Sequence, residues 1–199
     1  PNLIESLYEI GAGEYILAAS EYSDYPEAAK AIARVASHNI INFEEIVSLA
    51  PDLVMVWQSG FGVDAIAKLR SLGLKVYASE PHTLDDIENL LRDMGHLTGL
   101  LNGAELASAR YRQKLNQLQA DYSYKGTVSV FYQVWQEPMQ TLNGDHVVND
   151  AIELCGGKNV SAALPEIAPR VSVESVIAAK PKFIFSSGPN SQGISELAH

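Results

Sequence analysis

Aromatic side chains gather at and just beyond the ends of predicted strands. The strands are expected at Ile16–Ala19, Leu53–Trp57 and Thr127–Gln133. The aromatic residues at or after their carboxyl ends are Tyr22, Tyr25, Trp57, Phe61 and Trp135. Aromatic rings bury much surface and lose little rotamer freedom, so they suit a large, flat, partly apolar ligand. Any one of these rings could instead anchor the core or a loop. Trp57 is the strongest candidate for ligand binding, because it ends a buried strand, and Tyr22 is the next.

Two glutamates occupy equivalent positions in an internal repeat. Residues 44–55 match residues 174–185, and the offset is 130 residues for both Glu44 to Glu174 and Pro51 to Pro181. Each copy predicts a short helix, a proline stop and a buried strand. A carboxylate at a helix start is stabilised by the helix dipole, which is sufficient to explain each glutamate alone. Their equivalent placement indicates instead a pair of acidic groups that could engage arginines of one docking partner.

Residues suited to catalysis or metal binding form no recognisable pattern. The five histidines are scattered without a metal-binding spacing, and no nucleophile elbow or phosphate-binding loop is present. His38, in a predicted loop, is kept as a candidate ligand contact. Cys155 is expected to be a small buried residue. We therefore predict no catalytic residue, no metal ligand and no cofactor, and an α/β enzyme using His38 or Asp24 remains an alternative.

Apolar runs alternating with helical patterns predict an α/β fold with parallel sheets. Besides the strands above, strands are expected at 74–78 and 183–186, and helices at 1–11, 43–49, 63–72, 84–94, 102–121, 147–154 and 173–179. The helix over 102–121 would be about 30 Å long. Thr83 and Asp86 have the spacing of a capping box. The predicted organisation is an N-terminal α/β lobe over 1–100, a bridging helix over 101–123 and an incomplete C-terminal α/β lobe over 124–199.

The charge balance narrows the classes of partner. The 199 residues carry 14 Lys and Arg against 24 Asp and Glu, a net charge of -10. Nucleic acids and anionic membranes demand clustered cations, so neither is expected as a partner. The apolar stretches fall short of the ~20 residues of a membrane span. No signal peptide is present, and because Pro1 starts inside a helical pattern we expect that the sequence is trimmed.

Several motifs, in order along almost the whole chain, resemble those of periplasmic cobalamin-binding proteins. These motifs are Tyr22–Pro26, Asn42–Ile46, Pro51–Val54, Trp57 and Leu154–Val160. The resemblance implies the helical-backbone class of ABC transporter substrate-binding proteins, with two Rossmann-like lobes joined by one long helix. It implies a non-enzymatic periplasmic protein that holds cobalamin (vitamin B12) in the inter-lobe cleft as cargo and delivers this corrinoid to an inner-membrane permease. Tyr22 and Trp57 would contact the ligand, and Glu44 and Glu174 would dock the permease.

The sequence departs from that family at some positions. Family members can place tryptophans where His38 and Ala168 stand, and their pattern extends before Pro1 and beyond His199. The resemblance thus implies truncation at both ends. The same fold binding haem or a ferric siderophore is an alternative, although the predicted cleft loops are short of the cations that an anionic chelate requires. A binder of bare metal ions is a further alternative.

Overall fold

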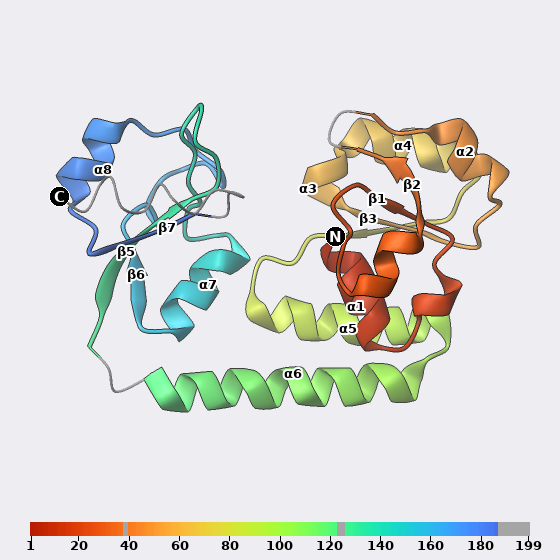
Figure 1. Cartoon of the computed structure of the whole chain (residues 1–199), viewed down its shortest axis with the longest axis horizontal. Coiled ribbons are helices and arrows are strands. Elements are labelled where there is room, and N and C mark those ends of the chain that lie inside the picture. Colours follow the sequence, from red (N-terminus) through yellow and green to blue (C-terminus); the bar gives the residue numbers. More distant parts are fainter. Residues whose placement is uncertain (38–39, 123–125, 187–199) are drawn as a thin grey trace. The chain divides into compact units, whose positions relative to one another are not determined.

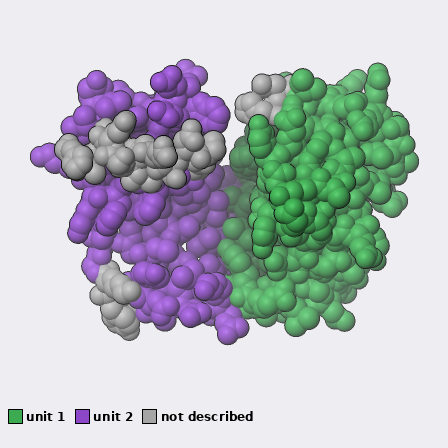
Figure 2. All heavy atoms as spheres, in the orientation of Figure 1, with its two compact units in different colours: residues 1–81, 87–111 green, residues 82–86, 112–199 purple. Residues whose placement is uncertain are grey.

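The computed structural model describes residues 1–37, 40–122 and 126–186, which form two compact units. Unit 1 comprises Pro1–Pro81 and Ile87–Tyr111, and unit 2 comprises His82–Asp86 and Arg112–His199 (Figure 2). The division between them falls near the start of helix α5 (Leu84–Thr98) and within the long helix α6 (Leu101–Tyr122). This helix has 22 residues and is therefore about 33 Å long.

Unit 1 alternates short helices with parallel strands (Figure 1). Strand β1 (Ala18–Ser20) pairs with β2 (Ala33–Ala36), and β3 (Val54–Trp57) pairs with β4 (Val76–Ser79), both in parallel. The helical elements, in chain order, are α1 (Asn2–Glu9), η1 (Gly13–Tyr15), η2 (Glu27–Ala31), α2 (Phe43–Ser48), α3 (Gln58–Phe61), α4 (Val63–Ser71) and α5 (Leu84–Thr98). The carboxyl ends of parallel strands carry the loops in which ligand-binding residues are expected.

Three apolar clusters hold the described part of unit 1 together, and the third and smallest comprises Ile4, Ala19 and Ala29. The first lies between α1, α5 and α6 and includes Leu3, Leu90, Met94 and Ala104. The second packs α2 and α4 onto β3 through Ile46, Val56, Ile66 and Leu69. Helix α6 approaches its neighbours closely because glycines lie at the contacts. A Cβ added to Gly103 would lie 2.1 Å from the carbonyl oxygen of Ile10, and one on Gly95 would lie 2.3 Å from the Cβ of Ala104.

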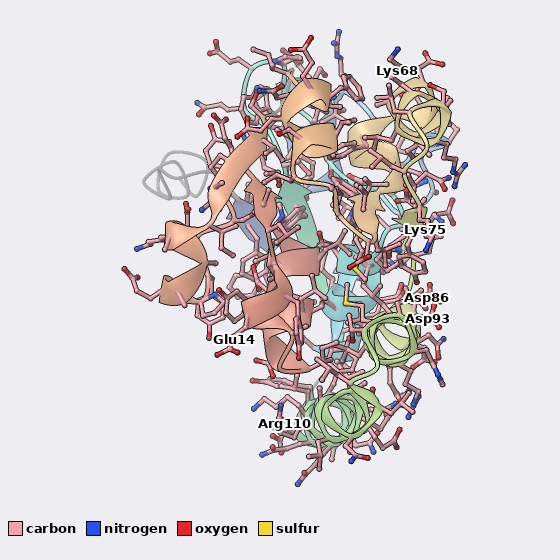
Figure 3. The ribbon with its side chains drawn as sticks, turned by 90° about the vertical axis from the view of Figure 1, so that its right-hand side faces the viewer. Glu14, Lys68, Lys75, Asp86, Asp93 and Arg110 are labelled. Carbon is pink, nitrogen blue, oxygen red and sulfur yellow. The ribbon has the colours of Figure 1, made fainter. Side chains whose placement is uncertain are left out.

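Polar contacts at the surface of unit 1, made by side chains that include Asp93 and Arg110 (labelled in Figure 3), support the same packing. The Tyr77 hydroxyl of β4 donates to Asp93 Oδ2 of α5 at 2.8 Å, and Arg110 of α6 forms an ion pair with Glu9 of α1 at 3.1 Å. Burial, followed by the hydrogen bond to Asp93 and its charge, raises the pKa of Tyr77 to about 12. The phenol is therefore held in its neutral, donating form.

Unit 2 contains a three-stranded parallel sheet with the order β6-β5-β7. Strand β5 (Val128–Gln133) lies between β6 (Gly157–Asn159) and β7 (Phe183–Ser186). Helices α7 (Val147–Leu154) and α8 (Val173–Ala179) belong to the same unit. The parallel sheets and intervening helices of both units confirm the predicted α/β class.

The sequence patterns predicted most helices and strands close to the positions that the structure shows. Helices α7 and α8 and strand β7 have the predicted bounds. The strand predicted over 16–19 is found as β1, which begins two residues later and ends one residue later. The capping box is confirmed, since Thr83 Oγ1 accepts from the Asp86 N–H at 3.2 Å and Asp86 Oδ2 accepts from the Thr83 N–H at 2.9 Å. The hydrogen bond from the Thr83 backbone is the main reason that the pKa of Asp86 is lowered.

Two expectations from the sequence are wrong. The strand of the second repeat copy is not buried, since Phe183 and Phe185 of β7 are each 50% exposed. Cys155 is exposed rather than buried. It caps the carboxyl end of α7 and precedes Gly156, which turns the chain with a φ of 77°. At this turn the thiol lies at the surface instead of facing the apolar interior.

Candidate functional site

The carboxyl ends of β3 and β4 carry a compact polar and aromatic cluster. Trp57 is the last residue of β3 and lies opposite Ser79 of β4, which places Glu80 just beyond that pair. The Trp57 indole N–H donates to Glu80 Oε1 at 3.0 Å. The backbone N–H of Ser59 donates to Glu80 Oε2 at 2.6 Å, and the Ser59 hydroxyl donates to the same oxygen. One carboxylate thus accepts from donors on Trp57 and Ser59, which belong to one segment and lie 21 to 23 residues away in sequence.

Sequence reasoning did not identify Glu80. Its residue type after a predicted strand is ordinary, and only the parallel register of β3 and β4 brings its carboxylate to Trp57. The pairing of the two parallel strands could in principle have indicated it. Once Ser79 is aligned with Trp57, the next residue, Glu80, must leave the sheet at the same edge as Trp57.

The indole of Trp57 is supported on its ring as well as at its N–H. A Cβ placed on Gly60 of α3 would lie 2.4 Å from Trp57 Cε3, so the missing side chain leaves the space that the ring occupies. Trp57 nevertheless remains 41% exposed. It therefore offers aromatic surface to a ligand from a restrained position.

Tyr22 and Tyr25 project from the loop that follows β1. They are 76% and 66% exposed, and Tyr22 adopts a φ of 63°, in the left-handed region. The loop itself is tied down, because Arg34 Nη2 of β2 donates to the Ser23 carbonyl at 2.9 Å and contacts Asp24 Oδ1 at 3.3 Å. A buried backbone anchor and two exposed rings make this loop a suitable contact surface.

The remaining ligand candidates have different surroundings. Phe61 of α3 is half-buried and packs against the second apolar cluster of unit 1, so it contributes to the core. Trp135 belongs to unit 2, is 61% exposed and donates its indole N–H to the carbonyl oxygen of Glu137 at 3.0 Å. His38 lies outside the described residues.

The two repeat copies fold into matching helix starts. Asn42 caps α2 by accepting from the Glu45 N–H at 3.1 Å, and Ser172 caps α8 by accepting from the Ser175 N–H at 3.2 Å. Two residues after each capping residue is an exposed glutamate, Glu44 in α2 and Glu174 in α8. The pKa of Glu174 is lowered by its own backbone N–H and then by the Ser172 side chain. Both carboxylates are therefore presented to solvent from a capped first turn.

The match continues through each helix. Ile46 and Val176 are the buried residues of their helices, each 6% exposed. One residue on, Val47 and Ile177 are 41% and 61% exposed, so each glutamate has an apolar neighbour on the surface. Both copies end in a left-handed residue before proline, Ala50 with a φ of 44° and Lys180 with a φ of 47°. The repeat is thus a repeat of structure as well as of sequence.

Other candidate features of the described residues involve different side chains. A shallow cavity of about 490 Å³ in unit 2 is bordered by the end of α6, the segment before β5 and α7, with Asp150 and Glu153 in its wall. Within residues 1–37, 40–122 and 126–186, His, Cys, Asp and Glu side chains form no group of three that could hold a metal ion. In the same ranges, the helices lack the length and apolar character needed to cross a membrane.

Comparison with known proteins identifies the class of this molecule. A family model described as periplasmic binding protein matches residues 1–199, and the chain therefore belongs to that family. Its fold is the helical-backbone periplasmic binding protein fold, as predicted.

Particular relatives are similar over most of the chain. The vitamin B12-binding protein of Vibrio cholerae serotype O1 is 37% identical over 187 residues, covering 94% of this chain and 68% of the relative. The vitamin B12-binding protein of Yersinia pestis is 34% identical over 192 residues, covering 96% and 69%. The crystal structure of the periplasmic vitamin B12-binding protein BtuF of Vibrio cholerae has a TM-score of 0.87 at 37% identity, covering 94% and 73%. The family resemblance seen in the sequence is confirmed.

More distant structures share only the fold. The periplasmic heme-binding protein RhuT from Roseiflexus sp. RS-1 has a TM-score of 0.83 at 21% identity, covering 93% of this chain and 73% of its own. At this identity the likeness supports the architecture and carries no information on the ligand.

Proposed function

We propose that this chain is the substrate-binding component of a bacterial ABC importer and that it binds cobalamin in the periplasm. The observation that carries the proposal is the 37% identity to the vitamin B12-binding protein of Vibrio cholerae over 94% of the chain. The exposed aromatic residues at strand ends agree with it, since a corrinoid is a large ring system with apolar faces.

In this proposal the aromatic residues have different roles in ligand binding. Tyr22, Tyr25 and Trp57 of unit 1 and Trp135 of unit 2 pack against the ligand, because all four are exposed. Phe61, which packs against the second apolar cluster of unit 1, contributes to the core of that unit. His38 remains a candidate contact. Cobalamin is cargo in this account, and the protein performs no chemistry on it and needs no cofactor of its own.

The two glutamates of the internal repeat serve delivery of the ligand to the permease. Glu44 and Glu174 engage arginines of an inner-membrane permease, where a planar guanidinium can form paired hydrogen bonds with a carboxylate. Val47 and Ile177 add apolar contact beside each acid, since both are exposed. The net charge of -10 favours approach to a basic protein surface.

Calorimetry with purified protein tests the ligand assignment. Titration of cyanocobalamin into the protein at micromolar concentration is expected to give saturable binding of one ligand per chain, and titration of haemin to give none. Visible spectra of protein passed through a desalting column with each compound provide an independent readout, since bound corrinoid and bound haem have different bands. Saturable haemin binding without cobalamin binding would transfer the assignment to haem.

A further inference from the structure

We propose that Glu80 is a positioning residue for ligand binding, whose carboxylate holds the indole of Trp57 in the orientation that receives the ligand. This inference rests on the proposed function. Glu80 itself has its oxygens engaged within the protein, so its effect on the ligand is exerted through the tryptophan.

The hydrogen bonds define what the carboxylate restrains. Oε1 accepts from the Trp57 indole, while Oε2 accepts from the backbone N–H and hydroxyl of Ser59. Hydrogen bonds to an ionised acceptor are about twice as strong as neutral ones. The bonds to Ser59 fix the carboxylate, and the fixed carboxylate then fixes the indole. Glu80 thereby joins the end of β4 to the end of β3 and the first turn of α3.

Gly60 supplies the second restraint. A Cβ at this position would lie 2.4 Å from Cε3 and 2.9 Å from Cζ3 of Trp57, so the six-membered ring packs directly over the glycine. The indole is held by Glu80 at its N–H and by Gly60 at its opposite part. Since 41% of the residue stays exposed, the restraint leaves surface for a ligand.

Trp135 offers an internal contrast. Its indole N–H donates to the carbonyl of Glu137, which is two residues away in the same segment. That bond restrains the ring only relative to its own loop. The bond from Trp57 to Glu80 spans 23 residues and ties the ring to a neighbouring strand. Orientation of Trp57 therefore depends on a tertiary contact that one substitution can remove.

The expected effect follows from the entropy of ordering a side chain. Immobilising one flexible side chain on binding costs about 0.5–1.5 kcal/mol. If Glu80 already immobilises the Trp57 side chain in the free protein, ligand binding does not have to pay this entropy. Removal of the Glu80 side chain then adds the entropic cost to ligand binding. Glu80→Ala is thus expected to weaken cyanocobalamin binding by about two- to thirteenfold. Glu80→Gln keeps one acceptor oxygen, which can serve Trp57 or Ser59 but not both, so an intermediate loss is expected.

The test follows the indole and the affinity separately. The chain contains two tryptophans, so Trp135→Phe leaves Trp57 as the single fluorescent indole. In this background, time-resolved fluorescence anisotropy of the free protein reports the motion of the Trp57 ring. Calorimetry on the corresponding proteins that retain Trp135 reports the cyanocobalamin affinity. Glu80→Ala is expected to increase the fast component of the anisotropy decay and to weaken binding. Glu14→Ala is the matched control, because it removes an exposed carboxylate from η1, which precedes β1 rather than following a strand end (Figure 3).

The outcomes are distinct. An anisotropy decay in Glu80→Ala identical to that of its parent would overturn the positioning role, and so would a mobile indole with undiminished affinity. If the unsubstituted protein, which retains Trp135, failed to bind cyanocobalamin, the proposed function would be wrong, while the anisotropy would still show whether Glu80 holds Trp57. If Glu80→Ala failed to fold, Glu80→Gln, which keeps the size of the side chain, would decide both points.

Discussion

At the scale of single residues, exposure separates the aromatic side chains that are free to bind from those that pack. Trp57 and Tyr22 are 41% and 76% exposed, whereas Phe61 is half-buried against Ile46, Val56, Ile66 and Leu69. Binding surfaces concentrate their energy in a few aromatic anchors. Substitution of the first two should therefore change affinity, and substitution of Phe61 should change stability.

Removing the Trp57 ring is expected to weaken cyanocobalamin binding strongly. Trp57→Ala should cost about 2 kcal/mol of binding free energy, or about 30-fold in affinity, as for a central aromatic contact. Trp57→Phe should lose less, because it retains a ring but not the N–H that Glu80 accepts. Calorimetry measures both. Binding of the Trp57→Ala variant at the parent's affinity would remove Trp57 from the site.

Phe61 is expected to give the opposite pattern. Phe61→Ala leaves a gap over the second apolar cluster of unit 1 and should lower the free energy of unfolding by about 2 kcal/mol, less than for a fully buried ring. Phe61→Leu fills most of the gap and is the matched control. Urea unfolding measures the change. A large loss of affinity with unchanged stability would show that Phe61 contacts the ligand directly.

At the scale of elements, the contact between β4 and α5 carries a titratable hydrogen bond. The pKa of Tyr77 is raised to about 12, mainly by burial, so the folded state favours the neutral phenol. A raised pKa stabilises the fold fully below the unfolded value of about 10. That contribution is lost as the pH rises through the folded value near 12.

Tyr77→Phe tests this contact while keeping the ring. The variant should be less stable at pH 8 by about 1 kcal/mol, the net value of one hydrogen bond. It should also lose less stability than the parent between pH 10 and 12, because it has no phenol to ionise at this position. Urea unfolding at pH 8, 10 and 11.5 measures both. Equal pH dependence in the two proteins would contradict the assignment.

Elements with strong local signals could be predicted from the sequence, and elements created by pairing could not. Helix α8 has a serine cap, a buried Val176 and a proline stop within a few residues. Strand β6, in contrast, is Gly157-Lys158-Asn159, which lacks β-branched and aromatic residues. It is a strand because it pairs with Val128–Val130 of β5. Tertiary context overrides weak local propensity in such segments.

The candidate site shows the same division. Trp57 could be recognised because it ends an apolar run, a property of the local sequence. The role of Glu80 depends on the register that aligns Trp57 with Ser79, and register is a property of two strands together. The positions of Glu44 and Glu174 could be predicted because the 130-residue offset repeats a whole helix-proline-strand pattern.

At the scale of the whole molecule, the structural repeat predicts that permease docking can be separated from ligand binding. Glu44→Lys together with Glu174→Lys reverses both exposed charges and should abolish cobalamin uptake through the permease. The affinity for cyanocobalamin should stay within about twofold, since each glutamate sits in a capped first turn and not at a strand end. A lysine at a helix start is disfavoured by the dipole, so a loss of stability of about 0.5 kcal/mol per site is expected as well.

Neutral variants separate docking from this helix effect. Glu44→Gln with Glu174→Gln removes the charges without placing cations at the helix starts, and should still weaken transport because the bidentate pairing with arginine is lost. Val47→Ser with Ile177→Ser leaves both acids in place and tests the apolar part of the surface, since these side chains are already exposed and contribute little to the fold. Transport is measured in vesicles carrying the permease, and binding is measured on the same preparations. Normal transport by the charge-reversed protein would show that the paired glutamates serve only to start their helices.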